Sequence, residues 1–230
     1  MKRIGILGGV SAESTVLYYR TITREVVRRT GRADYPEIII YSVSFGDFAR
    51  LQHAGEWDLI TARMVAVFQA LHRAGAQLGL IAANTLHAVF PEVARRSPIP
   101  LLSIVEATAR EAKRLGLERV GLLGTRFTME GDFYRRGMGE VGIEVIVPDP
   151  GEREEIHRII YQELARGLIR EDSRARFIGI AEKLIRKGAQ GIILGCTELP
   201  LLIPKDSLDV AILNTAEIHA LAALEAALGD

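Results

Sequence analysis

The residues best suited to chemistry in this chain are Cys196, Thr197 and Glu198, which supply a thiol, a hydroxyl and a carboxylate in succession. They follow an apolar run, residues 191–195, of the kind found in a buried parallel strand. Cys196 is the only cysteine, so an internal disulfide framework and a cysteine-rich zinc site are excluded. The thiol is a nucleophile, a proton-transfer base or an inert buried group.

A lone cysteine is often no more than a small buried hydrophobe. The position of Cys196 favours a functional thiol, because a helix is expected to begin there, with Pro200 inside its first turn. Backbone N–H groups and the dipole at such a helix start lower the pKa of a thiol. We therefore expect Cys196 to have a lowered pKa.

Two other patterns, the histidines and the glycines near the start of the sequence, carry less chemistry. The five histidines, at positions 53, 72, 87, 157 and 219, show no metal-binding spacing, and most are expected to lie on the surface or between helices. His87 differs in following an expected strand directly, where it could line a cleft or cap a helix. The glycines at 5, 8 and 9 do not form a dinucleotide fingerprint, which favours a tight turn, with a small anion at the helix start as the alternative.

The elements that must position these residues alternate between strands and helices. This order predicts an α/β class with parallel sheets and right-handed crossovers. Strands are expected at about 3–9, 37–43, 78–83, 99–105, 119–125, 144–147, 191–195 and 210–213, with helices between them. A polar connection is expected from Ser44 through Gln52, and helices at about 129–141 and 152–165.

The two halves of the chain repeat one plan. Arg-Ala-Gly-Ala-Gln at 73–77 matches Arg-Lys-Gly-Ala-Gln at 186–190, an offset of 113 (186 − 73) that places Ala83 on Cys196 (196 − 83). We therefore expect two pseudo-symmetric three-layer α/β domains, 1–115 and 116–230, with the active site in the cleft between them and the last helix of the first half able to cross to the other.

Composition narrows the function classes. The formal net charge is zero, which gives no indication of a nucleic-acid or membrane-surface partner. No run approaches the ~18 apolar residues of a membrane span, and the start of the sequence reads as a strand rather than a leader. The expected location is cytoplasmic.

At several separated places the sequence resembles the aspartate/glutamate racemase family. The opening Ile4-Gly5-Ile6-Leu7-Gly8-Gly9-Val10-Ser11-x-Glu13-Ser14-Thr15 is similar to that family's first motif. Leu194-Gly195-Cys196-Thr197-Glu198 resembles its second cysteine motif, and Asn84-Thr85-x-His87 resembles the tail of the first, Cys-Asn-Thr-x-His. The resemblance covers essentially the whole chain.

This resemblance implies a cofactor-independent racemase of acidic or related amino acids, working as a homodimer. In such enzymes two cysteines flank the substrate's α-carbon; one removes the α-proton and the other delivers a proton to the opposite face. Backbone amides at both motifs would bind the α-carboxylate. The implied catalytic positions are Cys196 and Ala83, and the implied substrate-binding positions are Val10, Gln52, Ala83, Asn84, Thr85, Thr125, Thr197 and Glu198.

The first cysteine position of the family is occupied by Ala83, which carries no proton. Three interpretations stay open: an engineered cysteine-to-alanine variant, which the intact flanking motif favours; a natural one-cysteine member in which water, Thr85 or His87 serves the second face; or a one-cysteine decarboxylase or isomerase of the wider superfamily. A catalytically silent small-molecule-binding protein is the non-enzymatic alternative. Arg50 and Arg126 are candidates for the distal carboxylate, and Ala165-Arg166 stand where some relatives have a lysine.

Overall fold

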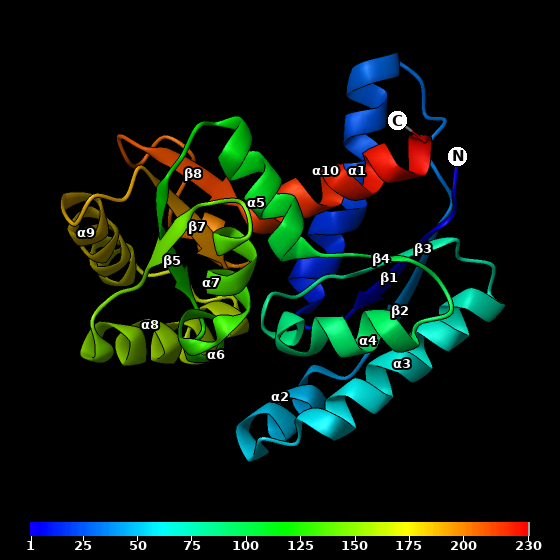
Figure 1. Cartoon of the computed structure of the whole chain (residues 1–230), viewed down its shortest axis with the longest axis horizontal. Helices are drawn as coiled ribbons and strands as arrows, with labels where there is room; N and C mark the ends of the chain where they lie inside the picture. The colour runs from blue at the N-terminus through cyan, green and yellow to red at the C-terminus, as the bar shows by residue number, and fades with distance from the viewer. Residues whose placement is uncertain (230) are drawn as a thin grey trace. The chain divides into compact units, whose positions relative to one another are not determined.

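A computed structural model describes residues 1–229 of the chain (Figure 1). It contains two four-stranded sheets in which every pairing is parallel. The first has the order β2-β1-β3-β4 and the second the order β6-β5-β7-β8. The strands are β1 (Ile4–Gly8), β2 (Ile38–Ser42), β3 (Leu78–Ile81), β4 (Leu101–Leu102), β5 (Arg119–Gly124), β6 (Glu144–Ile146), β7 (Gly191–Gly195) and β8 (Ala211–Asn214). The predicted fold class, with duplicated parallel sheets, is confirmed.

The chain forms two compact units that do not follow the midpoint of the sequence. The first unit comprises Met1–Ile104 together with the chain from Ala216 onward, and the second comprises Val105–Thr215. Helix α5 (Ile104–Arg114) lies with the second unit, and helix α10 (Thr215–Leu228) lies with the first. The predicted halves, 1–115 and 116–230, allowed the last helix of the first half to cross to the other, as α5 does, but did not foresee that α10 belongs to the first unit.

The remaining helices separate cleanly between the units. The first unit holds α1 (Ala12–Thr30), α2 (Phe45–Ala54), α3 (Trp57–Arg73), the 3-10 turn η1 (Thr85–Val89) and α4 (Phe90–Arg96). The second holds α6 (Arg126–Glu130), α7 (Asp132–Gly139), α8 (Pro150–Gln162), η2 (Leu164–Arg166), α9 (Glu171–Arg186) and η3 (Leu199–Leu201). No described helix is both long and apolar enough to cross a membrane.

The repeated Gly-Ala-Gln makes the same turn and the same hydrogen bond in both halves of the chain. Gly75 and Gly188 adopt φ values of 97° and 98°, which suit glycine in the turn from helix to strand. Two residues later, Oε1 of Gln77 accepts a hydrogen bond from the Arg3 amide at 2.9 Å, and Oε1 of Gln190 accepts one from the Glu118 amide at 2.6 Å. The repeat therefore ties β3 to the start of β1, and β7 to the start of β5.

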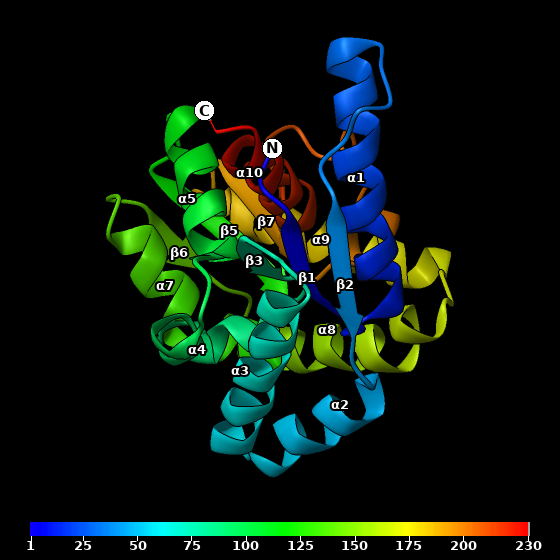
Figure 2. The same cartoon turned by 90° about the vertical axis from the view of Figure 1, so that its right-hand side faces the viewer.

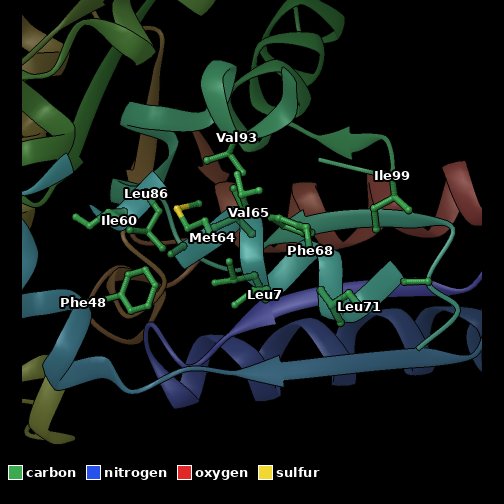
Figure 3. Packing of buried hydrophobic residues seen from close by; sticks show 14 residues of the cluster. Leu7, Phe48, Ile60, Met64, Val65, Phe68, Leu71, Leu86, Val93 and Ile99 are labelled. Carbon is green, nitrogen blue, oxygen red and sulfur yellow. The ribbon is translucent and has the colours of Figure 1, made fainter. Parts of the chain in front are cut away.

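Two apolar layers enclose the first sheet. One lies against α3 and includes Leu7, Phe68, Leu71 and Ile81 (Figure 3). The other lies against α1 and α10, where Tyr18, Ile22, Ala220, Ala223 and Leu224 are buried against alternate residues of β1 and β3. Figure 2 shows β2 at the edge of this sheet beside β1, with α2 following beyond its carboxyl end. The side-chain alternation of β1 thus supplies both layers.

Several predicted elements differ from the structure. The expected polar connection from Ser44 through Gln52 is mostly helix α2, because Phe48 and Gln52, four residues apart, are buried on one face and Gly55 closes the helix at φ 73°. The single helix expected at 129–141 is two helices, α6 and α7, separated at Gly131.

Candidate active site

The second unit brings two of the predicted site residues to neighbouring strand ends. In the register of β5 and β7, Gly124 pairs with Gly195, so Thr125 and Cys196 follow directly from paired positions. A Cβ on Gly195 would lie 3.0 Å from the Leu123 carbonyl oxygen, and one on Gly124 would lie 2.9 Å from the Gly195 oxygen. The two glycines therefore allow the strand ends that carry Thr125 and Cys196 to approach closely.

Cys196, Thr197 and Glu198 form a compact hydrogen-bonded group just after β7. The Cys196 thiol donates to Oε2 of Glu198 at a Sγ–O distance of 3.0 Å, and the Thr197 hydroxyl donates to the same oxygen at 2.8 Å. Cys196 and Glu198 are buried. A carboxylate that accepts a thiol's hydrogen bond can also accept its proton, so this pair can exchange a proton between sulfur and oxygen.

The prediction of a lowered Cys196 pKa is wrong. Burial raises the pKa well above its ordinary value, and the negative charge of Glu198 and its hydrogen bond raise it further. Backbone N–H groups of Thr197 and Glu198 act in the opposite direction, as expected, but are outweighed. The expected helix is also absent at this place: only the three-residue turn η3 follows, so no helix dipole assists the thiolate. The thiol rests in its protonated form.

Tyr161 of α8 lies near the thiol and its carboxylate, and His157 of the same helix packs against Tyr161. Burial raises the pKa of Tyr161 to about 12, together with repulsion from the thiolate that Cys196 forms at high pH and from Glu198, so Tyr161 lies within electrostatic range of the pair. The His157 and Tyr161 rings lie 4.7 Å apart between centroids, and Nδ1 of His157 accepts a hydrogen bond from the Arg126 amide at 3.2 Å. Sequence reasoning did not assign either residue to the site. The only available signal was their spacing of four on one helix face.

Thr125 has a structural role in addition to its place beside Cys196. It is the N-cap of α6, where its hydroxyl oxygen accepts a hydrogen bond from the Thr128 amide at 3.3 Å. Arg126, the candidate for a distal carboxylate, already pairs with Glu154 at 3.2 Å.

In the first unit, Ala83, Asn84 and Thr85 lie where β3 ends and η1 begins, and all three are buried. The Ala83 carbonyl oxygen is held by Nδ1 of His87 at 2.8 Å. His87 is buried inside the unit, with 1% of its surface exposed. Its Nε2 accepts a hydrogen bond at 3.1 Å from the amide of Ile104, the first residue of α5, so of the two alternatives His87 helps to cap a helix.

Val10 and Gln52 belong to the same unit as Ala83. Val10 follows β1 at the strand end next to that of β3, since Leu7 pairs with Ile81. Gly9 before it, at φ 90°, donates its N–H to the Thr15 hydroxyl at 2.8 Å, which fixes the turn into α1. Gln52 is buried on α2, and Arg50 on the same helix pairs with Asp47.

The predicted site residues thus form two groups, each within its own unit. The first unit carries Val10, Gln52, Ala83, Asn84 and Thr85, and the second carries Thr125, Cys196, Thr197 and Glu198. Within each group, the residues come from the carboxyl ends of adjacent parallel strands or from the helix that follows such a strand. This is the edge at which α/β proteins bind ligands.

A thiol hydrogen-bonded to a carboxylate at the end of a buried parallel strand is a pair of groups that can move protons at a small molecule. The chain belongs to the Asp/Glu/hydantoin racemase family, which matches residues 7–223. This is a family of racemases, so the protein is an enzyme of the amino-acid racemase type.

Similar proteins cover nearly the whole chain. A Yersinia pestis structure of the Asp/Glu racemase type is 42% identical with a TM-score of 0.91, covering 99% of this chain and 100% of that one. An aspartate racemase homologue from Pyrococcus horikoshii OT3 is 41% identical with a TM-score of 0.85, at the same coverage. The broad specificity amino-acid racemase RacX of Bacillus subtilis is 23% identical over 223 residues, covering 93% of this chain and 92% of RacX.

Proposed function

We propose that this protein racemises acidic or related amino acids by proton transfer at Cα, without a cofactor, and that turnover is impaired because Ala83 replaces one of two thiols. The observation that carries this proposal is the 3.0 Å hydrogen bond from the Cys196 thiol to Glu198. The names of the similar proteins, which include aspartate racemase homologue and broad specificity amino-acid racemase, support the substrate class.

The thiol and carboxylate account for both directions of proton transfer. Glu198 accepts the thiol proton, which leaves a thiolate on Cys196 and a neutral carboxyl on Glu198. The thiolate then removes the α-proton, leaving a carbanion and regenerating the thiol. In reverse, the thiol gives its proton to the carbanion. A single thiol serves one face of the α-carbon, whereas inversion also needs a proton donor at the other face.

The proposed binding groups are those at the strand ends. We propose as substrate-binding positions Val10, Gln52, Ala83, Asn84 and Thr85 in the first unit, where the Asn84 and Thr85 amides would bind the α-carboxylate, and Thr125, Thr197 and Glu198 in the second. Amide N–H groups aimed at developing charge are a common source of transition-state stabilisation. We also propose that the protein works as a homodimer, as the resemblance implies; sedimentation or light scattering tests this.

Exchange in D₂O tests the proposed chemistry. With L- and D-aspartate and L- and D-glutamate, we expect deuterium at Cα and little inversion, because Cys196 works from one face. Ala83→Cys should restore inversion, as it would if alanine stands in place of a native cysteine. Cys196→Ser should abolish exchange.

Other outcomes would favour the alternatives. Carbon dioxide release from an arylmalonate, without Cα exchange of any acidic amino acid, would indicate a one-cysteine decarboxylase. Binding of acidic amino acids without exchange, before and after Ala83→Cys, would indicate a silent binding protein. Undiminished turnover in Cys196→Ser would exclude the thiol from the mechanism.

A further inference from the structure

Two buried side chains hydrogen-bond to the successive carbonyl groups of Ala82 and Ala83, just after β3. The Ser14 hydroxyl, from α1, donates to the Ala82 carbonyl oxygen at 2.7 Å. One residue later, Nδ1 of His87 lies 2.8 Å from the Ala83 carbonyl oxygen. Ser14 and His87 are each 1% exposed. Two consecutive peptide groups at the candidate substrate edge are therefore fixed in orientation from inside the unit.

The partners of His87 determine its tautomer. Nε2 accepts a hydrogen bond from the Ile104 amide at 3.1 Å, so Nε2 carries no proton. Neutral imidazole has one N–H, which must then be on Nδ1, where it donates to the Ala83 carbonyl. Burial keeps the ring neutral by lowering the His87 pKa to about 4. The His87 ring thus donates to the Ala83 carbonyl after β3 through Nδ1, and accepts from the Ile104 amide at the start of α5 through Nε2.

The neighbours of His87 leave the ring little freedom. It stacks on Phe90, with centroids 5.1 Å apart and planes 11° from parallel, and meets the His219 ring edge-on at 5.9 Å. His219 is fixed in turn, because the Tyr18 hydroxyl lies 2.8 Å from Nδ1 and the Leu102 carbonyl lies 3.1 Å from Nε2. A ring that is stacked on Phe90, in edge contact with His219 and hydrogen-bonded to the backbone at both nitrogens is a rigid brace.

The brace determines where the next amide points. In a trans peptide the carbonyl and the N–H point in opposite directions. Since the Ala83 carbonyl points at the buried ring, the N–H of Asn84 points away from it. We propose that His87 is a positioning residue: by holding the Ala83 carbonyl, it directs the Asn84 amide toward the α-carboxylate of the bound amino acid. This inference rests on the proposed function and assigns to His87 a role that involves no proton transfer.

Nuclear magnetic resonance of the unmodified protein tests the brace directly. Long-range ¹H–¹⁵N spectra of the histidine rings at pH 7 should show Nδ1 of His87 protonated and Nε2 unprotonated. The Asn84 amide resonance should shift on titration with L-glutamate or L-aspartate. The opposite tautomer, or an Asn84 amide that does not respond, would overturn the inference.

Two substitutions separate the two hydrogen bonds of the ring. The amide nitrogen of Asn lies where Nδ1 lies, so His87→Asn can still donate to the Ala83 carbonyl. The side-chain oxygen of Gln lies where Nε2 lies, so His87→Gln keeps the bond to Ile104 and loses the one to Ala83. We expect His87→Gln to raise KM for Cα exchange about ten-fold, the effect of a lost hydrogen bond to a charged group, with kcat changed less than about three-fold. His87→Asn should change KM less than about three-fold.

The control is His72→Gln, because His72 is exposed on α3 of the same unit and should leave both constants unchanged. A similar rise in KM for His87→Asn and His87→Gln would show a merely structural role and defeat the inference, as would no rise in either. Failure of the proposed function reads differently. Cα exchange that is absent while the Asn84 amide still responds to glutamate removes the racemase proposal and leaves the brace. Cα exchange without any response of the Asn84 amide would keep the racemase proposal and remove the brace.

Discussion

Glu198 determines the chemistry of the only thiol in the chain. It accepts hydrogen bonds from both Cys196 and Thr197, and its negative charge opposes a second negative charge on the neighbouring sulfur. Glu198→Gln removes that charge at nearly constant size, so the Cys196 pKa should fall. We expect alkylation by iodoacetamide at pH 8 to become several-fold faster, with its pH profile moved to lower pH. Cys196 is the only cysteine, so the rate reports this thiol alone.

Glu140→Gln is the matched control for this measurement. Glu140 is an exposed glutamate of the same unit, at the end of α7, and its loss should leave the alkylation profile where it is. An unchanged profile in Glu198→Gln would show that the carboxylate does not control the thiol.

His87 should make stability depend on pH below neutrality. Its pKa in the folded protein is about 4, below the 6.5 of an unperturbed histidine, so the unfolded state binds the proton first. The contribution of the neutral ring is fully present above pH 6.5 and is lost as the pH falls toward 4. The loss is on the order of 3 kcal/mol over that range. Urea unfolding at pH 7 and pH 5 should show about 2 kcal/mol of this loss, and His87→Leu should show a smaller difference between the two pH values.

The sequence alone gave a partial view of these residues. The offset of 113 aligned Ala83 with Cys196, and both lie after equivalent strands of the two sheets. The sign of the Cys196 pKa shift was missed, because burial and the conformation of Glu198 depend on packing between distant segments. The contribution of Tyr161 and His157 was missed for the same reason.

At the scale of elements, helix α7 offers a matched pair of glycines. A Cβ on Gly137 would lie 2.5 Å from Cγ1 of Val105 on α5, whereas a Cβ on Gly139 would meet nothing within 4 Å. Alanine favours a helix over glycine by about 1 kcal/mol. We expect Gly139→Ala to be neutral or slightly stabilising, and Gly137→Ala to destabilise by about 1–3 kcal/mol through overpacking. Chemical denaturation of the two variants measures the difference.

Removing the obstructing methyl group tests the cause. In the background Val105→Ala, the penalty of Gly137→Ala should largely disappear, giving a coupling energy that distant residues do not show. Additive effects of the two substitutions would mean that α5 and α7 do not meet at this point.

The sequence predicts best those elements whose apolar residues form an unbroken or periodic pattern. The strands β1, β5 and β7, whose apolar runs are bounded by glycine, were placed within a residue or two. Helix α2 was missed because its first residues read as a polar loop, and its stability comes from burial of Phe48 against α3 and its neighbours. A helix was expected after Cys196 because Pro200 suits a first turn, but only three residues adopt a 3-10 turn there.

At the scale of the whole molecule, the assignment of α5 to the second unit and α10 to the first predicts which sheet a substitution in each helix destabilises. Ala223 on α10 is fully buried among residues of β1 and β3, and Ala109 on α5 is buried in the second unit. We expect Ala223→Leu to reduce hydrogen-exchange protection in β1 and β3, and Ala109→Leu to reduce it in β5 and β7, each by overpacking of about 1–3 kcal/mol. Loss of protection in β5 and β7 on changing Ala223 would contradict this division.

The return of α10 to the first unit also sets an order of events during synthesis. The second unit is one continuous stretch of chain. The first unit cannot complete its core until α10, which packs against β1 and β3, has been synthesised. At 5–20 residues per second, the ribosome needs roughly 5 to 20 seconds to make the intervening segment. During that interval the face of β1 and β3 that α10 will cover lies open to water, to chaperones and to other nascent chains. The part of the protein that is made first is thus the last to be completed.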